Sequence, residues 1–150
     1  MTVFATHHAI LDAFHAMALR PDDQWMRDDP DARAEIEANI TTFPSAALPS
    51  PVDPSVIFGV VVRHGVGTVW MVVGDRFKDT WRGIVRMHCL YAQAVVKVTK
   101  VRRLQMLVDD AQPSHKRYAE AIGFVRESVA PHVGLGPRGE NLVFYTWKGK

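Results

Sequence analysis

The sequence is poor in cysteine: Cys89 is the only one among 150 residues. A single thiol cannot form an intramolecular disulfide, which excludes a disulfide-stapled secreted fold and suits a reducing cytoplasm. Long hydrophobic runs are also missing, and none approaches the roughly 20 residues of a transmembrane helix. The segment Met1–His8 has neither the basic start nor the apolar stretch of a secretory signal, so we expect no such signal.

Net charge is small as well, at +2, with 23% charged and 47% hydrophobic residues. These values indicate one globular domain and exclude disorder, collagen and coiled coil. The charges are unevenly spread. Eight acidic residues face three basic ones between Asp12 and Glu37, and eight basic residues face one acid, Asp79, between Arg76 and Arg103. Such polarity docks an acidic partner or orients a chain in an assembly, or it marks two solvated faces.

The first third of the chain predicts helices and a connector. Apolar residues at helical spacing indicate an amphipathic helix from Thr6 that ends before Pro21. A more exposed helix is expected over Asp31–Ile40. Four prolines within Phe43–Pro54 then predict an extended connector without helix. We therefore divide the single domain 1–150 into N-terminal helices (1–43), a Pro-rich connector (44–55) and a sheet with helices (56–150).

The remainder reads as strands and helices that share one sheet. Two apolar runs joined by a glycine-containing turn predict a hairpin, and both are apolar on both faces, as in a covered sheet. A short helix is expected over Ser114–Ile122, with Ser114 as its N-terminal cap and Gly123 past its end. The fold class is α/β (α+β), with a mixed, largely antiparallel sheet flanked by helices. The expected elements are strands Val56–Val62, Thr68–Val73, Leu104–Val108, Phe124–Val129 and Asn141–Trp147, and helices Asp79–Val96 and Ser114–Ile122.

The second half of the chain resembles the GNAT acetyltransferases. Leu104-Gln-Met-Leu-Val108, then Ser114-His-Lys-Arg-Tyr-Ala-Glu-Ala-Ile-Gly-Phe124, then strands, is similar to their strand, short helix ending in a Leu/Ile-Gly-Phe turn, and closing hairpin. The hairpin and long helix at Val56–Val96 resemble their central part. The resemblance covers Val56–Trp147 and implies a GNAT-like fold, with acetyl-CoA as cofactor if the protein is an enzyme.

Three short segments also resemble a small family of short-tailed phage proteins. They are His7-His-Ala-Ile-Leu-Asp-Ala13, Ser114–Gly123 and the ending Phe144-Tyr-Thr-Trp-Lys-Gly. That family has the GNAT-like pattern and includes a protein linked to assembly of the internal core of the virion. This resemblance implies virion or assembly proteins as partners, with an oligomer as one arrangement, and a location in the virion or host cytoplasm. The lack of long apolar runs separately predicts no membrane partner, and nucleic acid ranks below a protein partner.

GNAT enzymes bind the pyrophosphate of acetyl-CoA on backbone N–H groups at the start of the long helix, in the pattern Arg/Gln-x-x-Gly-x-Gly/Ala. Glycine lets the phosphate approach, and the helix dipole favours the anion. The corresponding stretch here is Gly74–Gly83. With Arg76 at the first position, Asp79 and Trp81 stand where the small residues belong, which counts against an enzyme. If acetyl-CoA binds, the resemblance assigns its contacts to Val73, Gly74, Arg76 and Lys78.

The same residues have a structural explanation. Asp79 or Thr80 would cap the helix and Trp81 would pack on the sheet. A carboxylate and an indole at this point would shield the helix amides from a nucleotide thioester.

The general acid of GNAT enzymes is displaced too. Many of them carry a tyrosine four residues before the glycine of the Gly-Phe turn, but Ala119 stands there and Tyr118 is one residue earlier. One residue rotates a helical side chain by about 100°, so we expect Tyr118 to be packed or to face a partner. No catalytic residue is assigned.

Other candidate sites carry weaker patterns. His8, Asp12 and His15 lie at i, i+4 and i+7 and supply three ligands on one helical face, but no fourth ligand follows, and His8–Asp12 is equally a surface ion pair. We therefore predict no metal. Cys89, beside Met87 and Leu90, is expected to be a small core residue.

Two hypotheses from different classes remain. The first is a structural or assembly protein of the virion that keeps the GNAT-like sheet as a docking platform and lacks acetyl-CoA chemistry, with partner contacts on Pro44–Pro54 and the acidic helix. The second is an acetyl-CoA-dependent N-acetyltransferase with an atypical loop, whose pantetheine arm lies between the strands ending at Val73 and beginning near Leu104. A nucleic-acid-binding module using Lys97, Lys100, Arg102 and Arg103 ranks third.

Overall fold

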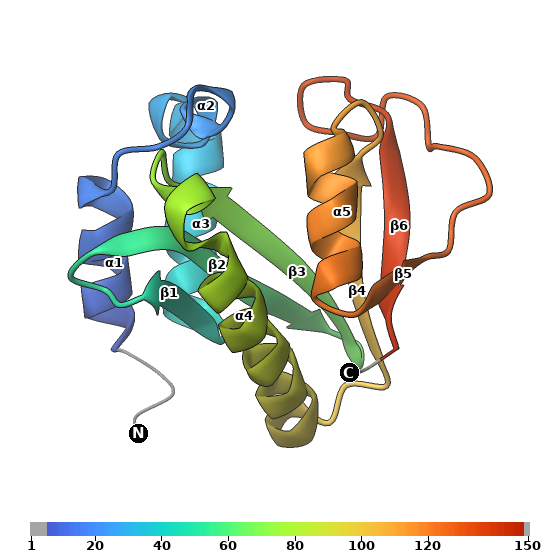
Figure 1. Ribbon diagram of the computed structural model, residues 1–150, viewed down its shortest axis with the longest axis horizontal. Helices are drawn as coiled ribbons and strands as arrows, with labels where there is room; N and C mark the ends of the chain where they lie inside the picture. The colour runs from blue at the N-terminus through green and yellow to red at the C-terminus, as the bar shows by residue number, and fades with distance from the viewer. Residues whose placement is uncertain (1–5, 149–150) are drawn as a thin grey trace. The chain divides into compact units, whose positions relative to one another are not determined.

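A computed structural model describes residues 6–148 (Figure 1). In chain order the elements are α1 (His7–Ala16), η1 (Pro21–Asp23), α2 (Trp25–Asp28), α3 (Pro30–Thr42), β1 (Ser45–Pro49), β2 (Pro54–Arg63), β3 (Val66–Val73), α4 (Phe77–Thr99), β4 (Arg103–Asp109), α5 (Pro113–Ala121), β5 (Phe124–Arg126) and β6 (Leu142–Trp147). The sheet order is β1-β2-β3-β4-β6-β5, with β3 and β4 parallel and the pairs β1–β2, β4–β6 and β5–β6 antiparallel. The predicted mixed, largely antiparallel sheet is confirmed.

The chain forms two compact units. The first contains the residues up to Val61 together with Trp70–Met87, and the second contains Val62–Val69 and the residues from His88 onward. Within the described part of the chain, no helix has both the length and the hydropathy to cross a bilayer.

Two capped helices open the first unit. The Thr6 hydroxyl accepts the Ala9 N–H at 3.3 Å, which starts α1, and Ile10 and Phe14 on one of its faces are fully buried. The Asp29 carboxylate accepts the Asp31 and Ala32 N–H groups, each at 2.9 Å, and caps α3, which begins at Pro30, one residue before the predicted start. Side-chain caps of this kind satisfy N–H groups that a helix cannot pair internally.

The prediction of a Pro-rich connector without regular structure is partly wrong. Residues 44–55 contain no helix, as expected, but Ser45–Pro49 forms the edge strand β1, which pairs with β2 in the register Ala47↔Ile57. Ser45–Leu48 are buried, so this half of the connector is not an exposed linker. Prolines are tolerated because they fall at the ends of this strand, where no ladder hydrogen bond is lost.

The predicted hairpin is confirmed, with longer strands. His64 (φ 51°) and Gly65 (φ 76°) form its turn, and two successive positive φ values match the right-handed twist of the flanking strands. The central residues of β2 are buried, as expected for a covered sheet.

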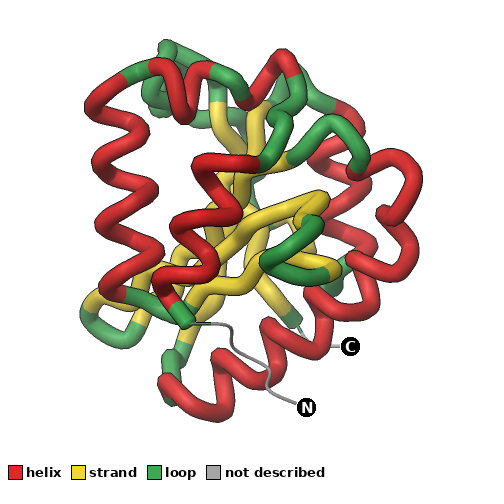
Figure 2. Tube along the Cα trace, turned by 90° about the vertical axis from the view of Figure 1, so that its left-hand side faces the viewer, coloured by secondary structure: helices red, strands yellow, loops and turns green. Residues whose placement is uncertain are grey.

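The strands of the first unit are covered on both faces. Ala47, Ile57 and Val72 share one buried cluster with residues of α1 and α3. Because side chains alternate along a strand, the buried Phe58 faces the other way, and Ile84 of α4 is likewise buried, outside that cluster. Figure 2 shows α3 and the first half of α4 on opposite sides of these strands.

The second unit contains the C-terminal elements. β4 pairs with β6 (Leu107↔Phe144), and β6 pairs with the three-residue edge strand β5 (Val125↔Thr146). The predicted capping of α5 by Ser114 is wrong: the helix begins at Pro113, and Gln112 precedes it without a side-chain cap. Proline at the first helical position needs no N–H partner. Gly123 follows the helix with φ 103°, as predicted.

Candidate functional site

The turn from β3 into α4 holds the residues that the resemblance assigns to a cofactor. α4 begins at Phe77, so Asp79 is its third residue, and the predicted capping by Asp79 or Thr80 is wrong. The Phe77 N–H donates to the Gly74 carbonyl at 3.3 Å, and the Asp79 N–H donates to the Arg76 carbonyl at 3.1 Å. Two amides at this end of the helix are therefore already bonded within the chain.

Gly74 is closely packed. Its N–H donates to the Ser55 carbonyl at 2.9 Å. A Cβ at this position would lie 3.1 Å from the Met17 sulfur and from the Ser55 carbonyl oxygen. Contacts this short are tighter than ordinary van der Waals separation, so the absence of a side chain here serves the fit of neighbouring segments.

Beyond the residues of β3 that pair with β4, the C-terminal end of β3 is hydrogen-bonded to an earlier segment of the chain. Leu19 and Gly74 form an isolated antiparallel bridge. The Arg20 N–H donates to the Val73 carbonyl at 3.0 Å, and the Asp75 N–H donates to the Ala18 carbonyl at 2.9 Å. Residues 18–20 thus act as a short extra strand against residues 73–75.

A buried carboxylate completes this edge. Asp23 Oδ2 accepts the Val73 N–H at 2.7 Å and lies 3.5 Å from Arg20 Nη2. Asp23 is 5% exposed. A buried N–H needs a partner, and Asp23 provides it, so both polar backbone groups of Val73 are satisfied inside the first unit. We call residues 18–20 together with Asp23 the edge strap.

The two basic candidates differ from each other. Arg76 forms an ion pair with Asp53, with 2.7 Å between Nη1 and Oδ1. Lys78 is exposed and forms no ion pair with any residue of the described range 6–148. Of the four assigned residues, only Lys78 therefore has its charged group available to a ligand.

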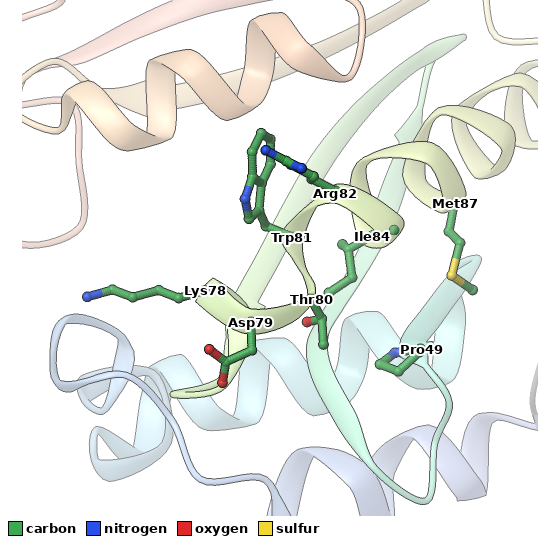
Figure 3. Close-up of a pocket in the computed structure, with 9 residues that line it drawn as sticks. Pro49, Lys78, Asp79, Thr80, Trp81, Arg82, Ile84 and Met87 are labelled. Carbon is green, nitrogen blue, oxygen red and sulfur yellow. The ribbon is translucent and has the colours of Figure 1, made fainter.

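Trp81 does not pack on the sheet as predicted. Its side chain is 44% exposed, and the guanidinium carbon of Arg82 lies 5.9 Å from its ring centroid. Figure 3 shows Trp81 and Arg82 on one side of the helix and Asp79 and Thr80 on the other. Charged neighbours outnumber apolar ones in this turn of α4, so the indole stays at the surface beside a guanidinium group.

A cavity of about 600 Å³ lies along the first turns of α4 (Figure 3). Its lining includes Pro49, Thr80, Gly83 and Met87. The Thr80 hydroxyl is buried and has no hydrogen-bond partner among residues 6–148. Gly83 is open, because a Cβ there would meet nothing within 4 Å.

Tyr118 belongs to the core of the second unit, which confirms its expected packing. It is 8% exposed, and its hydroxyl lies 2.9 Å from Nδ1 of the fully buried His88 of α4. Burial raises the pKa of Tyr118 well above its usual value. A phenol that holds its proton this firmly and bonds to a buried imidazole is poorly suited to protonate a leaving group.

The remaining candidates are ordinary structural residues. His8 lies 3.7 Å from Asp12 in an exposed i, i+4 pair, whereas His15 pairs with Glu37 at 3.2 Å. Among the described residues no cluster of three metal-ligating side chains forms. Cys89 is half-buried, and its thiol donates to the Ile122 carbonyl at 3.4 Å.

The four basic residues considered for nucleic-acid binding do not all have an available charge. Arg103 forms a bidentate ion pair with Glu127, which holds the pKa of that carboxyl at about 2. Lys97, Lys100 and Arg102 are exposed. One of the four cations is thus already neutralised within the second unit.

Sequence reasoning missed the edge strap. Asp23 looks like one member of an acidic run after Pro21, and its pairing with Val73 joins residues 50 positions apart. Gly74 was noticed for a different reason, as the start of a phosphate loop. No periodicity marks residues 18–23, so only the folded chain reveals their role.

Comparison with solved structures identifies the fold. No family model matches the sequence, and no curated protein matches it. Among solved structures, an acetyltransferase (GNAT family) from Bacillus anthracis matches with TM-score 0.63 and 14% identity over 95% of this chain and 90% of that one. A putative phosphinothricin N-acetyltransferase matches with TM-score 0.62 and 12% identity over 96% and 92%, and the IAA acetyltransferase from Bacillus cereus ATCC 14579 with 0.57 and 10% over 85% and 91%. The protein therefore has the GNAT fold, as the sequence motifs predict.

The residues around Val73 and Gly74 fit acetyl-CoA poorly. The N–H groups of Val73, Gly74, Asp75, Phe77 and Asp79 all donate to oxygen atoms of the chain. Shifting the family pattern to begin at Lys78 places Gly83 at the last small position, but Trp81 then occupies the other. Either alignment puts an indole where a phosphate needs space.

Proposed function

We propose that this chain is a GNAT-fold protein without acetyl-CoA chemistry that acts as a structural or assembly protein of a phage virion. The observation that carries the first part is the edge strap, because a pantetheine arm would need the backbone groups of Val73 that Arg20 and Asp23 already bind. The three segments that resemble short-tailed phage proteins support the role in a virion. Loss of the catalytic tyrosine position to the buried Ala119 agrees with both.

A second candidate function is an N-acetyltransferase with an atypical loop. The cavity along α4 favours it, because about 600 Å³ lies within the range of small-molecule sites. The unpaired Thr80 hydroxyl and the exposed Lys78 would then meet the cofactor. In that case the cofactor lies along α4 and leaves the edge strap in place.

Isothermal titration of the purified chain with acetyl-CoA, and separately with CoA, tests the proposal. We expect no binding heat and no thermal shift, because the backbone groups of Val73 are occupied by Arg20 and Asp23. Micromolar binding of either ligand would contradict the loss of acetyl-CoA chemistry and favour the second candidate.

The variant Trp81→Gly is the matched control. If the indole alone blocked a working phosphate loop, this variant would gain acetyl-CoA binding. We expect Trp81→Gly to show no acetyl-CoA binding either, because the edge strap is unchanged.

The assembly role needs its own measurement. For a structural protein, mass spectrometry of purified particles of the phage that carries this gene should detect the chain. For an assembly protein, particles made after the gene is interrupted should have an incomplete internal core. Particles of normal composition and infectivity without the gene would exclude this role.

A further inference from the structure

We infer that copies of this chain associate head to tail, through a basic face on α4 of one copy and an acidic face on α2 and α3 of the next. The basic face is Lys78, Arg82 and Arg86, and the acidic face is Asp28, Asp31 and Glu35. The inference deepens the proposed assembly role, on which it rests, by naming a second copy of the chain as the partner.

The basic face is a row of unpaired cations. Lys78, Arg82 and Arg86 follow one another at four-residue steps, which places them along one side of the helix, roughly 6 Å apart per step. All three are exposed, and none forms an ion pair with a described residue. The exposed ring of Trp81 next to Arg82 adds an apolar contact of the kind that anchors interfaces.

Two residues of the acidic face have the same spacing. Asp31 and Glu35 lie four residues apart on α3, and Asp28 lies at the end of α2 just before it. All three are exposed and make no ion pair within the described range. Arg33, the basic residue of α3, is about 200° around the helix from Asp31 and so lies off this face.

The two faces belong to the same unit, and α3 and the first half of α4 lie on opposite sides of its strands, as Figures 1 and 2 show. A contact between unlike faces is heterologous, so it repeats from copy to copy and produces a ring or a filament rather than a closed two-fold dimer.

A second copy fits this pair of surfaces better than nucleic acid does. Each stacked copy brings the three cations of α4 opposite three carboxylates, and two of these, Asp31 and Glu35, share the step of about 6 Å. The net charge of the chain is only +2. A phosphate backbone would be attracted by the basic face but repelled by the acidic one, whereas a repeating stack leaves neither face unmatched.

Sedimentation velocity of the full chain at low and at high salt tests the inference. We expect larger species at about 0.02 M salt and monomer at about 1 M salt, where the Debye length falls to roughly 3 Å. A chain that is monomeric at both salt concentrations, or whose association does not respond to salt, would overturn the inference while leaving the absence of acetyl-CoA binding untouched.

Charge reversal identifies the faces. Arg82→Glu with Arg86→Glu, and separately Asp31→Lys with Glu35→Lys, should each weaken association by roughly tenfold or more. Mixing the two variants should restore it, because one then has two acidic faces and the other two basic faces. The quadruple variant, which exchanges the faces and keeps the net charge, should associate like the parent.

The matched control is Arg63→Glu with Arg117→Glu, which makes the same charge change at exposed residues of the second unit. It should leave association unchanged. Equal weakening by this control, or no recovery on mixing, would refute the assigned faces. A salt-dependent mobility shift of DNA that Arg82→Glu with Arg86→Glu abolishes, in a chain that stays monomeric, would replace the second copy with nucleic acid.

Discussion

At the scale of single residues, Asp23 decides the character of the site. Its carboxylate binds the N–H of Val73 and lies beside the guanidinium of Arg20, in a position with almost no solvent. In this geometry one acidic residue takes the place that an external hydrogen-bond acceptor would otherwise fill. Its neighbour Asp22 is exposed and makes no comparable contact among the described residues.

Asp23→Ala should destabilise the protein by about 1–3 kcal/mol, because the buried N–H of Val73 loses its acceptor. Asp23→Asn should cost less, since the amide oxygen still accepts this hydrogen bond. Urea unfolding followed by circular dichroism measures both. Asp22→Ala is the control and should stay within about 0.5 kcal/mol of the parent; equal losses for Asp22→Ala and Asp23→Ala would show that the buried hydrogen bond is unimportant.

His88 is the other decisive residue, in the core of the second unit. It is 1% exposed, and burial lowers its pKa from 6.5 to about 3. The imidazole is therefore neutral at physiological pH and shares a hydrogen bond with the Tyr118 hydroxyl. The unfolded chain, in contrast, takes up a proton on this residue near pH 6.5.

Between pH 6.5 and pH 3 the unfolded state thus binds more protons than the folded state, and His88 makes the free energy of unfolding fall as the pH falls. Its share of the slope should reach about 1.4 kcal/mol per pH unit. Comparing urea unfolding of the parent and of His88→Gln at several pH values isolates this share, because the carboxylates are common to both. Tyr118→Phe keeps the imidazole and should keep the slope; identical slopes for the parent and His88→Gln would mean that His88 is not buried as a neutral group.

At the scale of elements, glycines in β2 and α4 play opposite roles. A Cβ at Gly59 in β2 would lie 2.8 Å from both the Pro44 carbonyl oxygen and the Trp70 ring. Gly83 in α4 has open space around it. The strand glycine allows close packing, whereas the helix glycine only adds freedom to the unfolded chain.

Gly59→Ala should therefore lower the free energy of unfolding by about 1–3 kcal/mol, and Gly83→Ala should raise it by about 0.5–1 kcal/mol. Thermal unfolding at one pH measures both. The second variant also bears on the candidate functions. If the second candidate is right, the new methyl group should weaken acetyl-CoA binding, whereas under the proposed function neither the parent nor Gly83→Ala binds acetyl-CoA. A loss of stability in Gly83→Ala would indicate a contact at this position that the open surroundings do not contain.

At the scale of the whole molecule, the protein combines the GNAT fold with a surface of strong polarity. Sheet, hairpin and long helix are present, and the N–H groups of Phe77 and Asp79 at the start of α4 are bonded within the chain. In the first unit, the basic face of Lys78, Arg82 and Arg86 and the acidic face of Asp28, Asp31 and Glu35 lie on different helices. Salt-sensitive head-to-tail association is the behaviour that we propose for this arrangement.

Much of the fold could be predicted from local patterns. The helical spacing that ends in Phe14 and the glycine turn at Gly65 each express a preference of neighbouring residues, and both helix and hairpin are present. The strand β1 could not be predicted, because its prolines argue against a strand and only pairing with β2 offsets them. Trp81 was misjudged for a similar reason: aromatic residues are usually packed, and what lies next to one depends on the neighbouring elements.

By itself, the sequence determined the fold class and most of the order of the elements, because these follow from periodicity and residue type along the chain. It also places Asp79 and Trp81 where the GNAT pattern has small residues. Only the tertiary structure decided which groups of the candidate site are free. Asp23 meets Val73, and His88 meets Tyr118, across 50 and 30 residues of chain. Hydrogen bonds over such distances depend on how the elements pack, and no local pattern encodes them.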